Sequence, residues 1–402
     1  MILHTRGKLQ RIYILLLSIL IFIVVTGCGG KKDWVRFRGE QGQGATSNTV
    51  RPPLGVKWKI HLQKKAETTY AFNNPVVLGN TIYFGSTDGN IYALDIESGY
   101  MRWVYKTNGA INSVPIADSE NIYIGSNDGS VYAVSQKEGE LQWRFQTDST
   151  VQSTIIRTRK SVVFVSDGGH VYAVSPETGK EQYRLPNPVW FYFTFQVYDD
   201  VIYFAPGPPS RPHSMGAYDI TSRQYLWILD TRELDAVWYS FPAIENDTLF
   251  FSTSDPYSDA WELDYYAYDR KTGELKWKYS DLSQFGFSLD LNLNELFDKN
   301  LRLLDYMAPS IWENLVIYTS GDSVVRALNT ETGKLVWEKT FESYTTSAPT
   351  VAGDYLYFGV SASTAGHPKG PRLVCLSARS GKKMWEYEIE GKLLSAPVIA
   401  QD

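Results

Sequence analysis

Cysteine and histidine are scarce in this sequence, which limits the chemistry that the chain can perform. Two cysteines, Cys28 and Cys375, and five histidines occur in 402 residues. The cysteines are far apart, and each histidine stands alone, without a second ligand at metal spacing. The sequence also lacks the Asp-x-Asp-x-Asp-Gly pattern of a calcium loop. We therefore predict a protein with no catalytic residues, no metal site and no cofactor.

The chain also has no excess of basic residues. It contains 39 Lys and Arg against 44 Asp and Glu, which gives a formal net charge of -5. Arg6, Lys8 and Arg11 lie in an N-terminal stretch without acidic residues, so the rest of the chain is more acidic still. This charge argues against nucleic acid, or an anionic lipid surface, as the main partner.

No hydrophobic run is long enough to form a membrane-spanning helix. The apolar run at residues 12–25 follows three basic residues and has the length of a signal-peptide core. It ends in Val25-Thr26-Gly27-Cys28, which resembles a lipobox, where the signal is cut before a cysteine whose sulfur carries diacylglycerol. We therefore predict a signal peptide over residues 1–27 and a lipid on Cys28. The alternative is an ordinary secretory signal with a stray cysteine at its end.

The residue after Cys28 indicates the location of the anchor. Gly29, and not Asp, follows the cysteine. By resemblance to Gram-negative sorting rules, the protein would lie in the cell envelope on the periplasmic face of the outer membrane; in a single-membrane bacterium it would lie on the cell surface. With Cys28 lipidated, Cys375 has no partner for a disulfide and is interpreted as a small core residue. Residues 28–54 are predicted to be a tether and a lead-in.

What the chain does contain is an internal repeat. An eleven-residue pattern with a small residue, a polar residue, a Thr-Gly or Ser-Gly pair and a final aromatic recurs seven times, most clearly at Ala93 to Trp103 and Ala267 to Trp277. Asp and Gly suit a reversal between two strands, because Asp bonds nearby backbone and Gly adopts positive φ. The final aromatics are predicted to pack against the neighbouring sheet, and they are Trp103, Trp143, Tyr183, Trp227, Trp277, Trp337 and Trp385.

Each copy of the pattern follows a predicted β-hairpin. Residues 82–93 and 122–133 consist of two alternating strands joined by Asp-Gly, a strong hairpin signal. We therefore interpret Asp88, Asp128 and Asp167 as turn residues and not as catalytic acids. A short strand that contains Pro precedes each hairpin, so the unit is four strands in about 40 residues, the size of a propeller blade. We predict an all-β protein with one β-propeller over residues 55–402, in preference to a β-sandwich.

The repeats predict a ring of the eight-bladed type with seven complete blades. Residues 394–399 match the first strand of a further blade, and Trp58, within residues 55–60, matches the fourth. The hairpin between them, about 12 to 15 residues by comparison with the other repeats, is missing. We expect a sequence truncated at its C-terminus. The alternative is a seven-bladed ring, with residues 55–60 added to the outside of another blade.

Four long segments interrupt the later repeats. Three replace the Asp-Gly turns, at 205–216, 252–262 and 361–372, and an insertion at 280–307 links the fifth blade to the sixth. Strands in a blade alternate in direction, so all four segments should project from one face. The apolar residues of the insertion either fold back as a cap or face a partner. The partner-binding candidates, chosen because arginine and aromatic residues often anchor interfaces, are Arg211, Tyr257, Trp261, Arg302 and Asp305.

The repeats resemble those of the pyrroloquinoline-quinone-type (quinoprotein-like) propellers. The segment from Trp34 to Gly44, followed by residues 55–60, is similar to the lead-in of such proteins. Together with the lipobox, it resembles the family of the outer-membrane protein assembly factor BamB. The resemblance implies a non-catalytic, lipid-anchored scaffold that binds a protein partner, the β-barrel assembly machinery, and is a monomer outside its complex.

Two other functions are compatible with the sequence. One is a degenerate quinone-dependent oxidoreductase. Against it, the quinone enzymes of the superfamily are expected to have a vicinal cysteine pair and calcium ligands, which this sequence lacks. The other is a surface lipoprotein that binds a small ligand or a polysaccharide through aromatic loop residues such as Tyr257 and Trp261.

Overall fold

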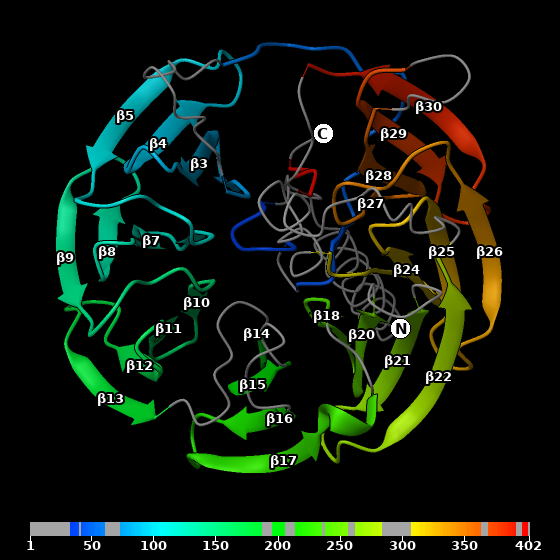
Figure 1. Ribbon diagram of the computed structural model, residues 1–402. Helices are drawn as coiled ribbons and strands as arrows, with labels where there is room; N and C mark the ends of the chain where they lie inside the picture. The colour runs from blue at the N-terminus through cyan, green and yellow to red at the C-terminus, as the bar shows by residue number, and fades with distance from the viewer. Residues whose placement is uncertain are drawn as a thin grey trace, which may run out of the picture.

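The computed structural model describes residues 33–39, 42–60, 73–186, 195–205, 214–234, 238–255, 262–283, 307–362, 369–390 and 396–400. These residues form seven antiparallel sheets that stand as blades around a common axis (Figure 1). Within each blade the strand order follows the chain, and the fourth strand lies on the rim of the ring. The predicted all-β propeller is confirmed.

The first four blades each contain four strands. Blade one consists of β2 (Val76–Leu78), β3 (Thr81–Gly85), β4 (Asn90–Asp95) and β5 (Met101–Lys106). Blade two consists of β6 (Ile116–Ala117), β7 (Asn121–Gly125), β8 (Ser130–Ser135) and β9 (Leu141–Gln146). Blade three consists of β10 (Ile156–Arg157), β11 (Val162–Ser166), β12 (His170–Val174) and β13 (Glu181–Pro186). Blade four consists of β14 (Phe195–Tyr198), β15 (Val201–Phe204), β16 (Ser214–Asp219) and β17 (Gln224–Asp230).

Blades five and seven have an additional strand. Blade five follows the short 3₁₀ helix η1 (Thr231–Leu234) and consists of β18 (Trp238–Tyr239), β19 (Ala243–Glu245), β20 (Thr248–Asp255), β21 (Glu262–Asp269) and β22 (Leu275–Leu282), with β18 and β19 both paired to β20. Blade six consists of β23 (Ser310–Trp312), β24 (Leu315–Thr319), β25 (Val324–Asn329) and β26 (Leu335–Thr340). Blade seven consists of β27 (Thr350–Ala352), β28 (Tyr355–Val360), β29 (Arg372–Ser377) and β30 (Lys383–Glu388), and β1 (Ala45–Thr46) pairs in parallel with β27.

The hydrophobic core lies between neighbouring blades. The second and third strands are covered on both faces, so they are apolar along most of their length, as in the fully buried β11. The rim strands alternate between buried and exposed positions, as β9 does. Side chains from two adjacent blades form the larger clusters; Tyr123 of blade two, for example, packs with Phe164 and Tyr172 of blade three. This arrangement explains why the repeat is needed, since one blade alone cannot bury its faces.

All seven blades carry a β-bulge at the same place. The pairing of the third and fourth strands slips by one residue after the small residue that faces the aromatic anchor, so Ala93 pairs with Trp103 but Leu94 pairs with Met101. The residues before the slip are Ala93, Ala133, Ala173, Ala217, Ala267, Ala327 and Cys375. A bulge increases the local twist of a strand. It therefore gives every rim strand the same bend next to its aromatic anchor.

The N-terminal lead-in lies inside the ring and contacts blades that are distant in sequence. Trp34 forms an antiparallel bridge with Val77 of blade one. The Phe37 ring packs with Val114, Phe241 and Ala308, which lie near the first strands of blades two, five and six. The lead-in then continues into β1 on blade seven. It therefore holds together the inner edges of at least five blades.

Residues 55–60 and 396–400 lie in no assigned strand and pack against blades one and seven, on the two sides of the space between these blades. On one side, the indole of Trp58 lies on Gly99 of blade one. On the other side, Ile399 is buried in a cluster with Tyr357 and Cys375 of blade seven. The blue N-terminal trace crosses the space between blades one and seven at the rim (Figure 1), and no described sheet includes residues 55–60. The ring is therefore of the eight-bladed type, with seven complete blades and an incomplete eighth, as predicted.

The strands of blade five extend further than the sequence indicates. β20, β21 and β22 each contain eight residues, against five or six in the corresponding strands of blade one. The predicted insertion at 280–307 therefore begins later, because residues 280–282 still belong to β22. No helix among the described residues is both long enough and apolar enough to cross a membrane.

Candidate functional site

The two faces of the ring differ in the segments that they carry. One face carries the hairpin that joins the second and third strands of each blade, together with the links between blades. For example, the Asn127 N–H of the blade-two hairpin donates to the carbonyl of Ala110, in the link from blade one, at 2.8 Å. The opposite face carries two other turns of each blade. One joins the first strand to the second, and the other joins the third to the fourth. In blade two these turns are bonded to each other, because the Gln136 N–H donates to the Glu120 carbonyl at 2.9 Å. We call the first the hairpin face and the second the turn face.

The four long segments of the later blades follow strands that end on the hairpin face. The described parts of blades four, five and seven lead into 206–213, 256–261 and 363–368, and β22 leads into 284–306. The predicted lipidation site and the partner-binding candidates lie outside the described residues, namely Cys28, Arg211, Tyr257, Trp261, Arg302 and Asp305. Their assignment stays a prediction.

The repeat tryptophans lie between blades and contact a glycine turn of the next blade. A Cβ atom added to Gly139, for example, would lie 2.6 Å from Cδ2 of Trp103. The contacts of this kind are Trp58 on Gly99, Trp103 on Gly139, Trp143 on Gly179, Trp227 on Gly273, Trp277 on Gly333 and Trp337 on Gly381. All six glycines have positive φ. Glycine is needed twice here, for the backbone conformation and for the space.

Each of these indoles also donates a hydrogen bond across the same interface. Nε1 of Trp103 donates to the Gln136 carbonyl at 3.2 Å, and Nε1 of Trp277 donates to the Thr330 carbonyl at 2.8 Å. The same bond recurs for the other four indoles. A buried indole N–H needs an acceptor, and the turn supplies it at a fixed offset. Trp385 instead stacks on Tyr387, at 5.8 Å between ring centroids.

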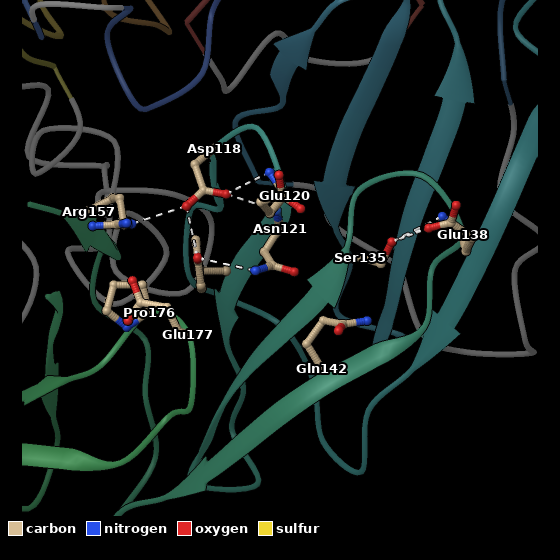
Figure 2. Close-up of a pocket in the computed structure, with 10 residues that line it drawn as sticks. Asp118, Glu120, Asn121, Ser135, Glu138, Gln142, Arg157, Pro176 and Glu177 are labelled. Atoms are coloured by element: carbon tan, nitrogen blue, oxygen red, sulfur yellow. Dashed lines mark hydrogen bonds and ion pairs between the residues drawn. The ribbon is translucent and has the colours of Figure 1, made fainter. Parts of the chain in front are cut away.

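A pocket lies on the turn face, between blades two and three (Figure 2). It has a volume of about 400 Å³, and its walls come from four turns and strands that are distant in sequence. Its lining is polar and includes four acidic residues, Asp118, Glu120, Glu138 and Glu177, and one basic residue, Arg157. Sequence analysis missed this pocket, because the turns that form it are minimal and resemble those of the other blades.

Asp118 of this pocket is occupied in holding the turn together. It accepts hydrogen bonds from the backbone N–H groups of Glu120 and Asn121 at 3.0 and 2.9 Å, from the Tyr123 hydroxyl at 2.9 Å and from Arg157 Nε at 3.1 Å. Burial alone would raise the pKa of Asp118, but these bonds to the charged form outweigh it and lower the pKa. The carboxylate therefore stays ionised and has a structural role.

The repeated aspartates elsewhere have the same kind of role. Asp95 accepts from the backbone N–H groups of Glu97 and Ser98, at 3.1 and 2.8 Å, within its own turn. Asp88 accepts from the Asn90 N–H at 2.9 Å and from the Tyr92 hydroxyl at 2.7 Å in its hairpin. Within the part of the chain that the structure describes, no group of three His, Cys, Asp or Glu could hold a metal ion.

The repeated hairpin, bulge, turn and inter-blade indole define a β-propeller of the quinoprotein-like class. The family described as outer membrane protein assembly factor BamB matches residues 55–279, 266–367 and 321–402. The chain therefore belongs to the BamB family. No curated protein sequence matches it.

Solved structures share the fold at low sequence identity. The quinohemoprotein alcohol dehydrogenase of Comamonas testosteroni matches with a TM-score of 0.67 and 14% identity, over 91% of this chain and 74% of that one. The alcohol dehydrogenase ADHIIG of Pseudomonas putida HK5 matches with a TM-score of 0.63 and 17% identity, over the same shares. BamB of Moraxella catarrhalis matches with a TM-score of 0.48 and 17% identity, over 70% of this chain and 78% of that one. The two dehydrogenases show the propeller fold of this chain and nothing about its activity.

Proposed function

We propose that this protein is a non-catalytic propeller scaffold that takes part in the assembly of outer-membrane β-barrel proteins. Its membership of the BamB family is the observation that carries the proposal. The partner would bind the hairpin face, through the segments 206–213, 256–261, 284–306 and 363–368. The eight-residue strands of blade five support this choice, because they extend the rigid ring toward those segments.

A lipid on Cys28 would hold the scaffold at the periplasmic face of the outer membrane. The lipobox-like string before Cys28 motivates this assignment, and the acidic remainder of the chain favours a lipid over charge as the attachment. Such an anchor would leave the ring free to turn its hairpin face toward a membrane-embedded partner.

The rival function is a degenerate quinone-dependent oxidoreductase. The dehydrogenases among the structural matches share only the fold. Asp88, Asp95 and Asp118 each accept backbone N–H hydrogen bonds that hold their turns, which favours the scaffold. An absorbance spectrum of the purified protein, with and without added quinone and calcium, separates the two functions. A stable quinone spectrum together with alcohol oxidation would contradict the scaffold proposal.

Affinity purification from native membranes tests the scaffold proposal itself. The full chain should co-purify with proteins of the barrel assembly machinery. A variant in which residues 256–261 and 284–306 are replaced by short Gly-Ser linkers should lose those partners. Lys137→Glu, on the turn face, is the matched control and should keep them. In the same preparation, Cys28→Ser should appear in the soluble envelope fraction. Recovery of a polysaccharide in place of assembly proteins would favour the ligand-binding alternative.

A further inference from the structure

The N-terminal lead-in joins the ring on the turn face of blade one. Oδ1 of Asp33 accepts the Gly79 N–H at 2.8 Å, in the turn between β2 and β3. The next residue, Trp34, is paired with Val77 of β2 by two backbone hydrogen bonds of 2.9 and 2.8 Å. The chain that precedes Asp33 is therefore attached to the ring at this turn.

The predicted lipidation site is close to this turn along the chain. Only residues 29–32 separate Cys28 from Asp33. Five residue steps span at most about 18 Å, even when the chain is fully extended. A lipid on Cys28 would lie in the bilayer, so it would hold the turn face of blade one close to the membrane surface. The short connection therefore restricts which part of the ring can meet the membrane.

The second turn of blade one belongs to the same corner of the ring. The Ile96 N–H donates to the Asn80 carbonyl at 3.1 Å, so the turn between β4 and β5 is bonded to the turn that holds Asp33. We call residues 79–80 and 96–101 the blade-one corner. Any membrane held near Asp33 also lies near this second turn.

The blade-one corner exposes a pair of apolar side chains that no other repeat carries. After the turn glycine Gly99, Tyr100 is 79% exposed and Met101 is 50% exposed. At the position of Tyr100 the other six repeats have polar residues, namely Glu140, Lys180, Gln224, Glu274, Lys334 and Lys382. The turn therefore does not require an aromatic residue here, and packing within the ring does not explain one that is so exposed.

We propose that the blade-one corner contacts the bilayer that holds the lipid of Cys28, with Tyr100 and Met101 in the headgroup layer. Tyrosine is enriched at membrane–water interfaces, because its ring is apolar and its hydroxyl stays hydrated. Two side chains bind a membrane weakly by themselves, but a lipid anchor keeps them at its surface and makes the second contact intramolecular. This contact depends on the proposed lipid at Cys28, and it adds the orientation of the ring. Because only one corner touches the membrane, the hairpin face stays open to a partner.

Photolabelling of the unchanged, lipidated protein tests the contact. The protein is reconstituted in phosphatidylethanolamine–phosphatidylglycerol vesicles that contain a phospholipid with a diazirine at its headgroup, and labelled peptides are identified by mass spectrometry. The peptide with Tyr100 and Met101 should carry the label, as should the tether next to Cys28. The peptide with Glu140 and Leu141, the matched turn of blade two, should carry none, although Leu141 is 44% exposed. A labelled tether without label at Tyr100 would overturn the proposal and leave the lipid anchor intact.

Two variants separate the contact from the anchor. Tyr100→Lys combined with Met101→Glu gives blade one the pair that blade three carries as Lys180 and Glu181, so the turn should still form. This variant should lose the label at residues 96–101 and keep it on the tether; unchanged labelling there would contradict a role of the two side chains. Cys28→Ser should lose both labels. If Cys28→Ser keeps them, the lipid does not bring this corner to the membrane, and the proposal is wrong.

Discussion

The ring of Tyr183 lies against the guanidinium of Arg223, whose Cζ is 4.9 Å from the ring centroid. At the other blade interfaces a glycine of the following blade lies under the indole. Arg223 occupies the corresponding turn position here, and its φ of 58° is in the same left-handed region. Tyr183 occupies the position of the indole. The two changes occur together at one interface, because a residue with a Cβ atom leaves no room for an indole on that turn. The smaller phenol and a cation–π contact replace the indole–glycine contact.

The two substitutions should therefore be energetically coupled. We expect Tyr183→Trp alone to destabilise the fold by about 1–3 kcal/mol, because the indole would overlap the Arg223 side chain. Tyr183→Trp combined with Arg223→Gly should recover most of that loss. Denaturant unfolding of the four proteins of the cycle measures the coupling. If the two substitutions change the free energy of unfolding additively, Tyr183 and Arg223 do not compensate each other sterically.

The glycine turns should tolerate no side chain where an indole covers them. Gly139→Ala should destabilise the fold by roughly 2–4 kcal/mol, since the added methyl meets Trp103 and φ is 74°. Gly79→Ala is the matched control, because its φ of 55° is also positive but nothing lies within 4 Å of the added Cβ. The control should cost only about 1 kcal/mol. Equal losses of unfolding free energy would remove the role of the indole contact.

The indoles should stabilise the ring in proportion to their burial. Trp277 is 7% exposed, and Trp277→Ala should lower the free energy of unfolding by about 3–5 kcal/mol.

If residues 55–60 act as the rim strand of the eighth blade, Trp58→Ala should also destabilise the fold measurably. The nearby Val56→Ala, at a position 49% exposed, should change the unfolding free energy by less than about 0.5 kcal/mol. Thermal melts in which Trp58→Ala behaves like Val56→Ala would contradict the eighth-blade position.

The turn that contains Asp118 should contribute a pH-dependent stability. Its hydrogen bonds favour the carboxylate and lower its pKa in the folded state. The resulting stabilisation is present above the unfolded pKa of about 4 and is lost as the pH falls through the lower folded pKa. Asp118→Asn should therefore lower Tm most at pH 7, and the difference from wild type should shrink below about pH 4. Glu140→Gln, at an exposed position, is the control. A difference that does not change between pH 7 and pH 3 would contradict the hydrogen-bonded carboxylate.

The repeat made most of the fold predictable from the sequence. Asp88 and Gly89 identify a hairpin and Trp103 a rim strand, and the spacing from Ala93 to Trp103 recurs in every blade, so local chemistry and global architecture agree. The incomplete eighth blade also followed from this offset, since Trp58 precedes Trp103 by nearly one repeat.

Features that depend on contacts between distant residues could not be predicted. The sequence around Arg38 shows a short lead-in rich in glycine. The contact of Arg38 with Ser310 becomes visible only in the folded ring, because the two residues are 272 positions apart in the chain. The coupling of Tyr183 with Arg223 and the pocket at Asp118 likewise join residues of different blades. The long segments of the hairpin face carry no repeat from which their conformation could be inferred.

Site-specific photocrosslinking in the native envelope tests the scaffold proposal most directly. A photoreactive residue placed at position 257 or 302, in the long segments of blade five, should capture a protein of the barrel assembly machinery. The same residue at position 137 or 332, on the turn face, should capture none. Capture from 137 or 332 but not from 257 or 302 would contradict the assignment of the hairpin face as the partner-binding surface.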